Sequence, residues 1–254
     1  MYIKAEEVEA PPFTFTISAR SKSEDVPVFA FLRKRYGNIP LNQIESLFGF
    51  VRRSTLYGGR PFTASELSHR DVAQLNNAGI GLRLPLTNHL VTRQEYEGAR
   101  NFLTRYHHKL NSVIATNDEL ASWVKEDFPL YKRDASVIKN INNHRKLDKA
   151  LELYDSVVLP MPCNEDIEFL KSIEDKSRIT LFANAGCAMT CPSRICYASF
   201  SEFNKFKGGE VRCSRSVKER DSFGMIDFQL QPLLDLGFRQ FKLLRSRPGG
   251  QTGF

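Results

Sequence analysis

Four of the chain's five cysteines lie in one segment, and their spacing is suited to binding a metal. The segment contains Cys187-x3-Cys191-x4-Cys196, and Cys213 follows further along the chain. Thiolates are scarce, soft ligands, so four of them in one segment favour a shared metal centre over chance burial. Structural zinc sites commonly use Cys-x2-Cys pairs, which this segment lacks, and the wider spacing therefore favours a 4Fe-4S cluster, with zinc as the alternative. We predict that these four cysteines are the metal ligands.

The fifth cysteine, Cys163, lies apart from this segment, and we interpret it as inert or as a substitute for one of the four ligands. The Cys-x3-Cys pair also occurs in the radical S-adenosylmethionine motif, Cys-x3-Cys-x2-Cys. Here the third cysteine comes two residues too late, and the segment follows the sixth predicted strand instead of the first. An odd number of cysteines also argues against a disulfide framework. Metal ligation is therefore the preferred interpretation.

Several basic and amide side chains come at or near the ends of predicted strands, where α/β barrels gather their functional groups. Such side chains bind carboxylates or phosphates through charge-assisted and bidentate hydrogen bonds. The candidates for binding an anionic substrate are Arg60, Arg83, Asn88, Lys139, Asn184, Arg194, Lys242 and Arg245. No histidine has the spacing of a zinc motif or of a nucleophile paired with a base, so no catalytic residue is assigned.

The elements that must position these residues are short β-rich runs that alternate with amphipathic helical stretches. Eight such runs predict an α/β fold of the TIM type, a (β/α)8 barrel, and an incomplete barrel or one open at its C-terminal end is the alternative. Thr63-x-x-Glu66 and Thr92-x-x-Glu95 have the form of capping boxes, which predicts that helices start there. The strands are expected at residues 50–56, 80–86, 112–116, 134–138, 156–161, 179–183, 225–228 and 238–244.

The chain is expected to have two parts. Residues 1–48 form an N-terminal lead-in that packs on the barrel, with an edge strand near 13–18 and a helix over 41–48. Residues 49–254 form the barrel itself. The cysteines fall in an insertion at about 184–222, which is longer than an ordinary crossover between strands.

The charge balance suits an anionic partner. The 254 residues include 36 Lys and Arg against 29 Asp and Glu, a net charge of +7. This excess fits RNA or another anionic ligand, although a solvated basic surface explains it equally well. No final helix is predicted after the eighth strand, so a protein partner could cover that end of the barrel. Without a signal peptide or an apolar run of membrane-spanning length, we expect a cytoplasmic protein that does not contact a membrane.

Three stretches around the cysteines carry a family resemblance. They are the run 154–160, the motif Asn184-x-Gly-Cys187-x3-Cys191-Pro-x-Arg194, and the run 237–245, Gly-Phe-Arg-Gln-Phe-Lys-Leu-Leu-Arg. Together they resemble the collagenase-like peptidase family, also called unclassified peptidase family 32, and are most similar to its short, divergent members. The resemblance implies a barrel-like fold with a 4Fe-4S cluster on four cysteines. It also implies oxygen-independent hydroxylation, of a quinone precursor or of bases in transfer and ribosomal RNA, with prephenate as a proposed oxygen source.

Three hypotheses about function follow. The first is an iron-sulfur enzyme that hydroxylates or otherwise modifies RNA or a small anionic or aromatic substrate. The second is a protein that binds nucleic acid or a protein partner and uses the metal only to hold its insertion in place. The third is a peptidase, an activity claimed for some members of the family. It is the weakest, because the sequence contains no Ser-His-Asp or Cys-His arrangement with supporting context.

Overall fold

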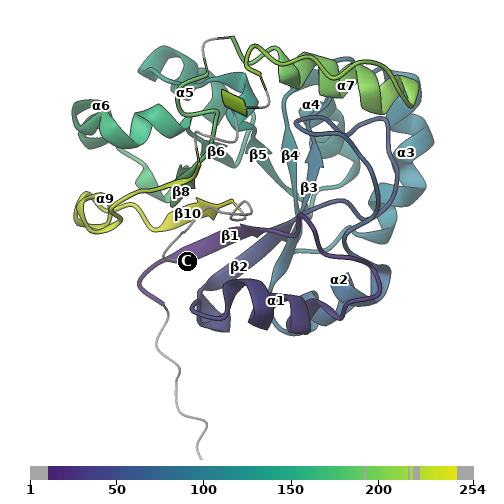
Figure 1. Ribbon diagram of the computed structural model, residues 1–254, viewed down its shortest axis with the longest axis horizontal. Coiled ribbons are helices and arrows are strands. Elements are labelled where there is room, and N and C mark those ends of the chain that lie inside the picture. Colours follow the sequence, from purple (N-terminus) through teal and green to yellow (C-terminus); the bar gives the residue numbers. More distant parts are fainter. Residues whose placement is uncertain (1–10, 192, 217, 220–223, 245–254) are drawn as a thin grey trace, which may run out of the picture.

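The chain forms a closed barrel of parallel strands, as the computed structural model shows (Figure 1). The structure describes residues 11–191, 193–216, 218–219 and 224–244, and within these the order around the barrel is β1-β10-β7-β6-β5-β4-β3-β2. The barrel strands are β1 (Thr14–Ser18), β2 (Ile44–Phe48), β3 (Gly81–Leu86), β4 (Ser112–Ala115), β5 (Lys132–Ala135), β6 (Ser156–Val158), β7 (Ile179–Phe182) and β10 (Gln240–Leu243). The predicted TIM-type barrel is confirmed. The alternative of an open C-terminal end is wrong, because β10 pairs in parallel with β1.

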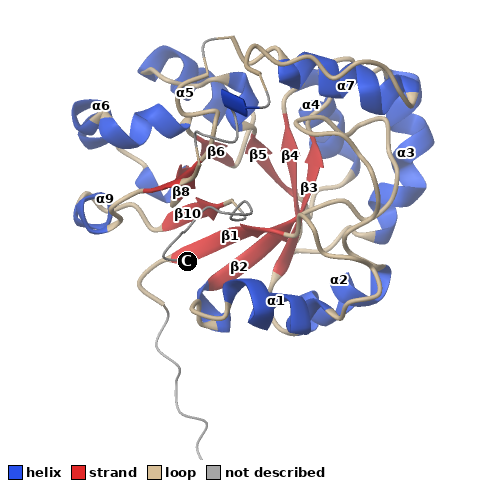
Figure 2. Cartoon of the chain, viewed as in Figure 1, coloured by secondary structure: helices blue, strands red, loops and turns tan. Residues whose placement is uncertain are grey.

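Helices surround the strands (Figure 2). Their starts follow local capping rules: Thr92 and Glu95 form the predicted capping box, and Ser68 and Asp71 form another. The helix start predicted at Thr63 is wrong, because that residue lies in a loop. The α-helices are α1 (Val28–Tyr36), α2 (His69–Asn77), α3 (Arg93–Arg105), α4 (Asp118–Asp127), α5 (His144–Leu151), α6 (Ile167–Ser172), α7 (Cys196–Phe206) and α9 (Gln231–Asp235). Short 3-10 turns occur at η1 (Leu41–Gln43), η2 (Val137–Lys139), η3 (Met161–Glu165) and η4 (Lys176–Arg178).

The first two barrel strands differ from the prediction. Residues 14–18 and 44–48, expected in a lead-in that packs on the barrel, are themselves barrel strands. The apolar residues of 41–48 fit a helical period as well as a strand, and pairing with β1 and β3 decides in favour of the strand. Residues 50–56, predicted as the first strand, form a loop whose apolar side chains are buried against the core. The β-rich composition of this loop therefore reflects burial and not strand pairing.

The insertion between β7 and β10 contains a separate small sheet. Residues 225–228 were expected to form the seventh barrel strand, but β9 (Ile226–Asp227) instead pairs antiparallel with β8 (Asn184–Ala185). This pairing draws the far end of the insertion back to its beginning. The cysteine segment and α7 lie between these two strands along the chain.

The barrel interior contains a buried polar network. The guanidinium of Arg83 donates to Ser46 Oγ at 2.8 Å and to Glu45 Oε2 at 2.8 Å, and it pairs with Asp134 at 3.2 Å. Asp134 also accepts hydrogen bonds from Ser112 Oγ at 2.8 Å and Ser156 Oγ at 2.5 Å. These side chains come from β2 to β6, and they hold one cation inside the barrel with its negative partners.

Among the described residues, no helix is both long and apolar enough to cross a bilayer.

Candidate functional site

A cavity of about 340 Å³ opens where the barrel strands end. Almost every barrel strand contributes a wall residue at or just after its last position. The cavity therefore lies at the carboxyl face of the barrel, where barrels of this type place their chemistry. The wall residues from the strands and the loops that follow them include Ser18, Phe48, Thr87, Ile114, Ser136, Met161, Phe182, Lys242 and Leu244.

All four cysteines predicted as ligands line this cavity. Cys187 and Cys191 follow β8, Cys196 is the first residue of α7, and Cys213 comes after that helix. The insertion thus brings four thiols, from the start of α7 and from the segments before and after it, to one cavity. Cys163 does not line the cavity; it is buried within η3, and burial raises the pKa of its thiol to about 11. This position fits the interpretation that Cys163 is inert.

Two of the thiols receive hydrogen bonds from nearby backbone and hydroxyl groups. Cys191 Sγ accepts from the backbone N–H of Arg194 at 3.3 Å and lies 3.5 Å from Ser214 Oγ. Burial raises the pKa of Cys191, but these hydrogen bonds outweigh it, so the pKa is lowered overall. Cys213 Sγ accepts from the backbone N–H of Arg215 at 3.5 Å. Donors of this kind stabilise thiolates and tune iron-sulfur clusters.

Cys196 has the opposite tendency. Burial first, and then the nearby charges of the other three thiols, raise its pKa to about 11. Within the ranges that the structure describes, no three Cys, His, Asp or Glu side chains are grouped closely enough to hold a metal ion. The four thiols match a cluster in chemical type and number, but not in their present spacing. The sulfur atoms would have to move together when a cluster binds, as is common where metal binding and folding are coupled.

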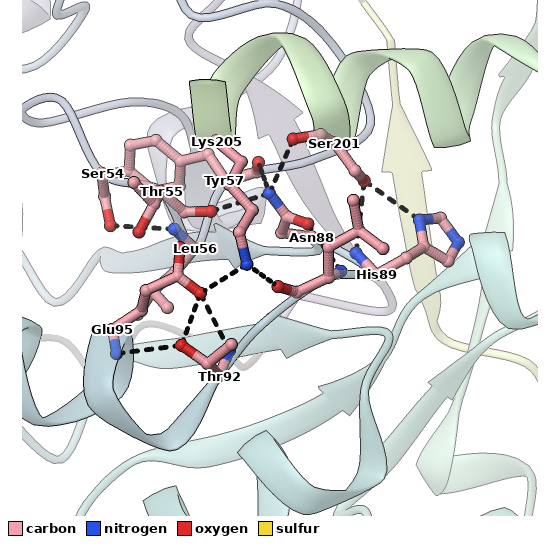
Figure 3. Close-up of polar contacts among 11 residues, drawn as sticks. Ser54, Thr55, Leu56, Tyr57, Asn88, His89, Thr92, Glu95, Ser201 and Lys205 are labelled. Atoms are coloured by element: carbon pink, nitrogen blue, oxygen red, sulfur yellow. Dashed lines mark hydrogen bonds and ion pairs between the residues drawn. The ribbon is translucent and has the colours of Figure 1, made fainter. Parts of the chain in front are cut away.

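Two buried asparagines, Asn88 and Asn204, hold α7 against the barrel, and Figure 3 shows the contacts of Asn88. Asn88 donates from Nδ2 to the carbonyl oxygens of Thr55 at 2.7 Å, Tyr57 at 3.2 Å and Ser201 at 3.0 Å. Asn204 of α7 donates to the carbonyl oxygen of Tyr57 at 3.1 Å and to that of Arg60 at 2.9 Å. Asn88 is 0% exposed, so its amide is used by the fold and does not reach the cavity. The two amides fix the helix that begins with Cys196.

An ion pair adds to this attachment. Lys205 of α7 donates to Glu95 Oε2 of α3 at 2.9 Å and also to the carbonyl oxygen of Leu90 (Figure 3). His89 Nδ1 lies 3.0 Å from Ser201 Oγ in the same region. Ser201 is 0% exposed, so this pair cannot present a nucleophile to a substrate. The contacts around Ser201 therefore serve to position α7.

The cavity wall is basic. Among the described residues that line it there are five cationic side chains and no carboxylate; the cations are Arg20, Arg60, Arg194, Arg215 and Lys242. Arg60 is paired with Glu66 and stacks on the ring of Phe50, 3.8 Å from the ring centroid. Arg194 donates to Asn140 Oδ1 at 2.6 Å, a neutral partner, and it forms no ion pair within the described part of the chain. This charge pattern favours an anionic ligand.

Seven of the eight predicted substrate-binding residues are described by the structure, and three of these line the cavity: Arg60, Arg194 and Lys242. Arg83 is held inside the barrel by its network, and Lys139 is paired with Asp118 at 2.6 Å. Asn184 is buried and bonds to the backbone of Leu244 at both amide atoms. Asn88 attaches α7, as described above, and Arg245 lies outside the described residues.

Two basic wall residues were not predicted from the sequence. Arg20 follows the end of β1, and the sequence pattern of that strand predicts an edge strand outside the barrel. Assigning the alternating run at residues 13–18 to the barrel would have placed it at the carboxyl face. Arg215 lies two residues after Cys213, and this closeness in sequence to a predicted metal ligand could have identified it as a residue of the site.

The fold and this cavity define the class: an α/β-barrel protein with a basic, cysteine-lined cavity at the carboxyl ends of its strands. The solved structure of the U32 peptidase Mk0906 is similar, with a TM-score of 0.64, 12% identical residues, and 97% of each chain covered. Identity this low shows a shared fold alone. The structure of a GH113 beta-1,4-mannanase aligns with 92% of this chain and 88% of the mannanase chain at 13% identity. Its TM-score of 0.40 is too low to indicate a shared fold. No family model matches the sequence. No curated protein matches it either.

Proposed function

We propose that the protein is an iron-sulfur enzyme that binds a 4Fe-4S cluster through Cys187, Cys191, Cys196 and Cys213. The single observation that carries this proposal is that all four thiols, from the start of α7 and from the segments before and after it, line one cavity at the carboxyl face of the barrel. A purely structural metal would not need a substrate-sized cavity beside it. Zinc is the alternative metal, and four thiolates also suit it. Once bound, a cluster would supply electron transfer or Lewis acidity at the cavity wall.

The substrate we propose is a small anion, an aromatic acid, or a single base of RNA that enters the cavity. A volume of about 340 Å³ falls in the range of small-ligand sites and excludes a nucleic-acid duplex. The cations on the wall favour an anion, and apolar neighbours such as Phe48, Met161 and Phe182 favour an aromatic or aliphatic body. Oxygen-independent hydroxylation or a related modification is the reaction class that the sequence resemblance implies.

The residues of the cavity have different roles in the binding that we propose. Arg194, on the same segment as the cysteines, carries its charge at the cavity and can bind a carboxylate or phosphate. Arg60 is held by Glu66 and shapes the wall beside it. The side chains of Phe48 and Phe182 provide apolar surface against which the body of a ligand can pack.

A peptidase is the function named for the structurally similar U32 protein, and we do not favour it for this chain. Of the histidines, all of which lie in the described ranges, none lines the cavity. In the part-buried contact between His89 and Ser201 the serine itself is buried, and neither residue has an acidic partner among its described hydrogen bonds. A nucleophile with an activating base is therefore not assembled at the cavity.

Metal analysis under anaerobic conditions tests the proposal. The full chain is reconstituted with iron and sulfide, and iron, sulfide and zinc contents are measured together with the broad absorbance near ~400 nm of cysteine-ligated clusters. We expect each of the four Cys→Ala variants at positions 187, 191, 196 and 213 to lose cluster content. Cys163→Ala is the matched control and should keep it. A wild-type protein that takes up no iron, or a Cys163→Ala variant that loses as much as the others, would contradict the assignment.

A further inference from the structure

Lys242 of β10 is a buried cation without an acceptor in the part of the chain that the structure describes. Its side chain lines the cavity, and the residue is only 8% exposed. The ammonium Nζ lies 4.4 Å from the centroid of the Phe48 ring, and no hydrogen bond or ion pair of this group occurs among the described residues. The ammonium therefore faces an aromatic ring and the cavity.

The other buried cations of the barrel have carboxylate partners. Lys22 donates to Asp71 Oδ2 at 2.7 Å, and Arg83 is paired with both Glu45 and Asp134. A buried charge without such a partner is costly, and groups of this kind concentrate at functional sites. Lys242 departs from the rule that the rest of the barrel follows. A bound ligand or a chemical role would account for this difference between Lys242 and the other buried cations.

Burial and the surroundings of Lys242 lower the pKa of its ammonium group. Its register partners on the adjacent strands, Thr16 and Phe182, are uncharged. The charged groups that act on it from across the barrel are Arg83 and Asp134, and the carboxylate is already bound by Arg83 and two serine hydroxyls. Burial first, and then the charge of Arg83, lower the pKa of Lys242 to about 8, although Asp134 acts in the opposite direction. Desolvation and a nearby cation are the two means by which proteins activate lysines that form imines.

We propose that Lys242 forms an imine with the carbonyl carbon of a small oxo acid bound in the cavity. The amine lone pair attacks the carbonyl carbon while the C=O π electrons move to oxygen, and a proton passes from nitrogen to that oxygen. The resulting hydroxyl then leaves as water, taking the second amine proton, as the C=N bond forms. Arg194, which lines the same cavity, is suited to bind the carboxylate of such a ligand.

This inference deepens the proposed function, because it rests on the cavity being the substrate site, but it does not require a bound cluster. The chemistry uses only the lysine and a carbonyl compound. It also narrows the substrate class from any small anion to one with an aldehyde or ketone beside its acidic group.

Reductive trapping tests the inference. The full chain is treated briefly at neutral pH with glyoxylate and cyanoborohydride, which delivers hydride to an imine carbon and leaves a stable carboxymethyl-lysine. Peptide mass mapping then compares Lys242 with an exposed lysine such as Lys149. We expect Lys242 to react faster by about tenfold or more, because a larger fraction of its amine is neutral. Equal labelling of the two positions would overturn the inference.

Two variants provide the controls. Lys242→Arg keeps the positive charge but cannot form an imine, so the fast-labelled site should disappear. Lys139→Arg changes a lysine that is paired with Asp118 outside the cavity and should leave the fast site intact. Survival of fast labelling in Lys242→Arg would also refute the assignment. If that variant does not fold, the comparison of labelled positions in the wild-type chain still decides.

The trapping is performed before and after cluster reconstitution, so that the two proposals can fail separately. A chain that assembles a cluster but is not labelled at Lys242 loses the imine and keeps the iron-sulfur assignment. A chain that is labelled at Lys242 but binds no iron supports the imine and contradicts the iron-sulfur assignment.

Discussion

Asn88 and Asn204 share one acceptor, the carbonyl oxygen of Tyr57, and this makes their contributions to the attachment of α7 interdependent. The two Nδ2 atoms lie 3.2 Å and 3.1 Å from that oxygen. Changing either asparagine to alanine leaves Tyr57 with the other donor. Changing both leaves a buried carbonyl without a side-chain partner, so the double variant should lose more stability than the two single variants together.

The magnitude follows from the groups left unsatisfied. In Asn88→Ala the carbonyls of Thr55 and Ser201 and the backbone N–H of Leu90 lose a hydrogen bond, which should cost about 2–4 kcal/mol. Asn204→Ala removes the acceptor of the Phe62 backbone N–H and the donor to Arg60, with a similar cost. The bare Tyr57 carbonyl in the double variant should add about 1–3 kcal/mol beyond the sum.

Hydrogen exchange of the backbone amides in α7 measures this free energy directly, because detachment of the helix opens those amides without unfolding the barrel. The matched control is Asn142→Ala, an exposed asparagine bonded to Lys146, which should change the opening free energy by less than about 0.5 kcal/mol. Single-variant costs that simply add, or that add to less than their sum, would refute the shared-acceptor argument.

Two further outcomes are expected from the barrel interior. Arg83→Met should lower the free energy of unfolding in urea by about 3–5 kcal/mol, because it leaves Asp134 buried without its cation; adding Asp134→Asn should recover part of that loss, and a double variant as unstable as the single one would contradict this. Lys242 has a folded-state pKa of about 8, below its ordinary value, so the folded state binds fewer protons than the unfolded chain above that pH. Wild-type stability should therefore rise relative to Lys242→Met as the pH increases from about 8 to about 10, by about 1–3 kcal/mol; a constant difference across that range would show that the amine is not perturbed.

The barrel could be predicted from the sequence because its middle strands alternate with well-capped helices. The runs that became β3, β4, β6 and β7 are short and mostly apolar, and the Thr92 box marks the start of α3 as expected. β5 is the exception, because it is Lys-Arg-Asp-Ala and only residues 134–135 of the predicted run 134–138 belong to it. The first two strands could not be identified, because β1 is a short alternating run like an edge strand and β2 has a period compatible with a helix. Only pairing across the closed barrel decides such cases.

The grouping of the four cysteines at one cavity could also be predicted from their spacing in the sequence. The other residues of the site could not, because their positions depend on contacts between distant parts of the chain. Arg83 and Lys139 have the right residue type near strand ends, yet carboxylates from other elements hold them away from the cavity. Asn88 was recognised as a polar residue after a strand, but its partners Tyr57 and Ser201 are far apart in the chain. Sequence patterns report local position, and they do not report which side chains are already satisfied.

The pairing of β1 with β10 has a consequence for how the protein is made. β1 can pair with β2 early in synthesis, but its other edge stays bare until residues 240–243 emerge, long after β1 itself. An unpaired edge is a site for aggregation, and parallel pairing across so long a separation is slow. Both strands of this pair line the cavity, β1 through Ser18 and β10 through Lys242. The cavity is therefore incomplete in the newly made chain until this last strand docks, and a chaperone that shields the edge of β1 would also control when the cavity forms.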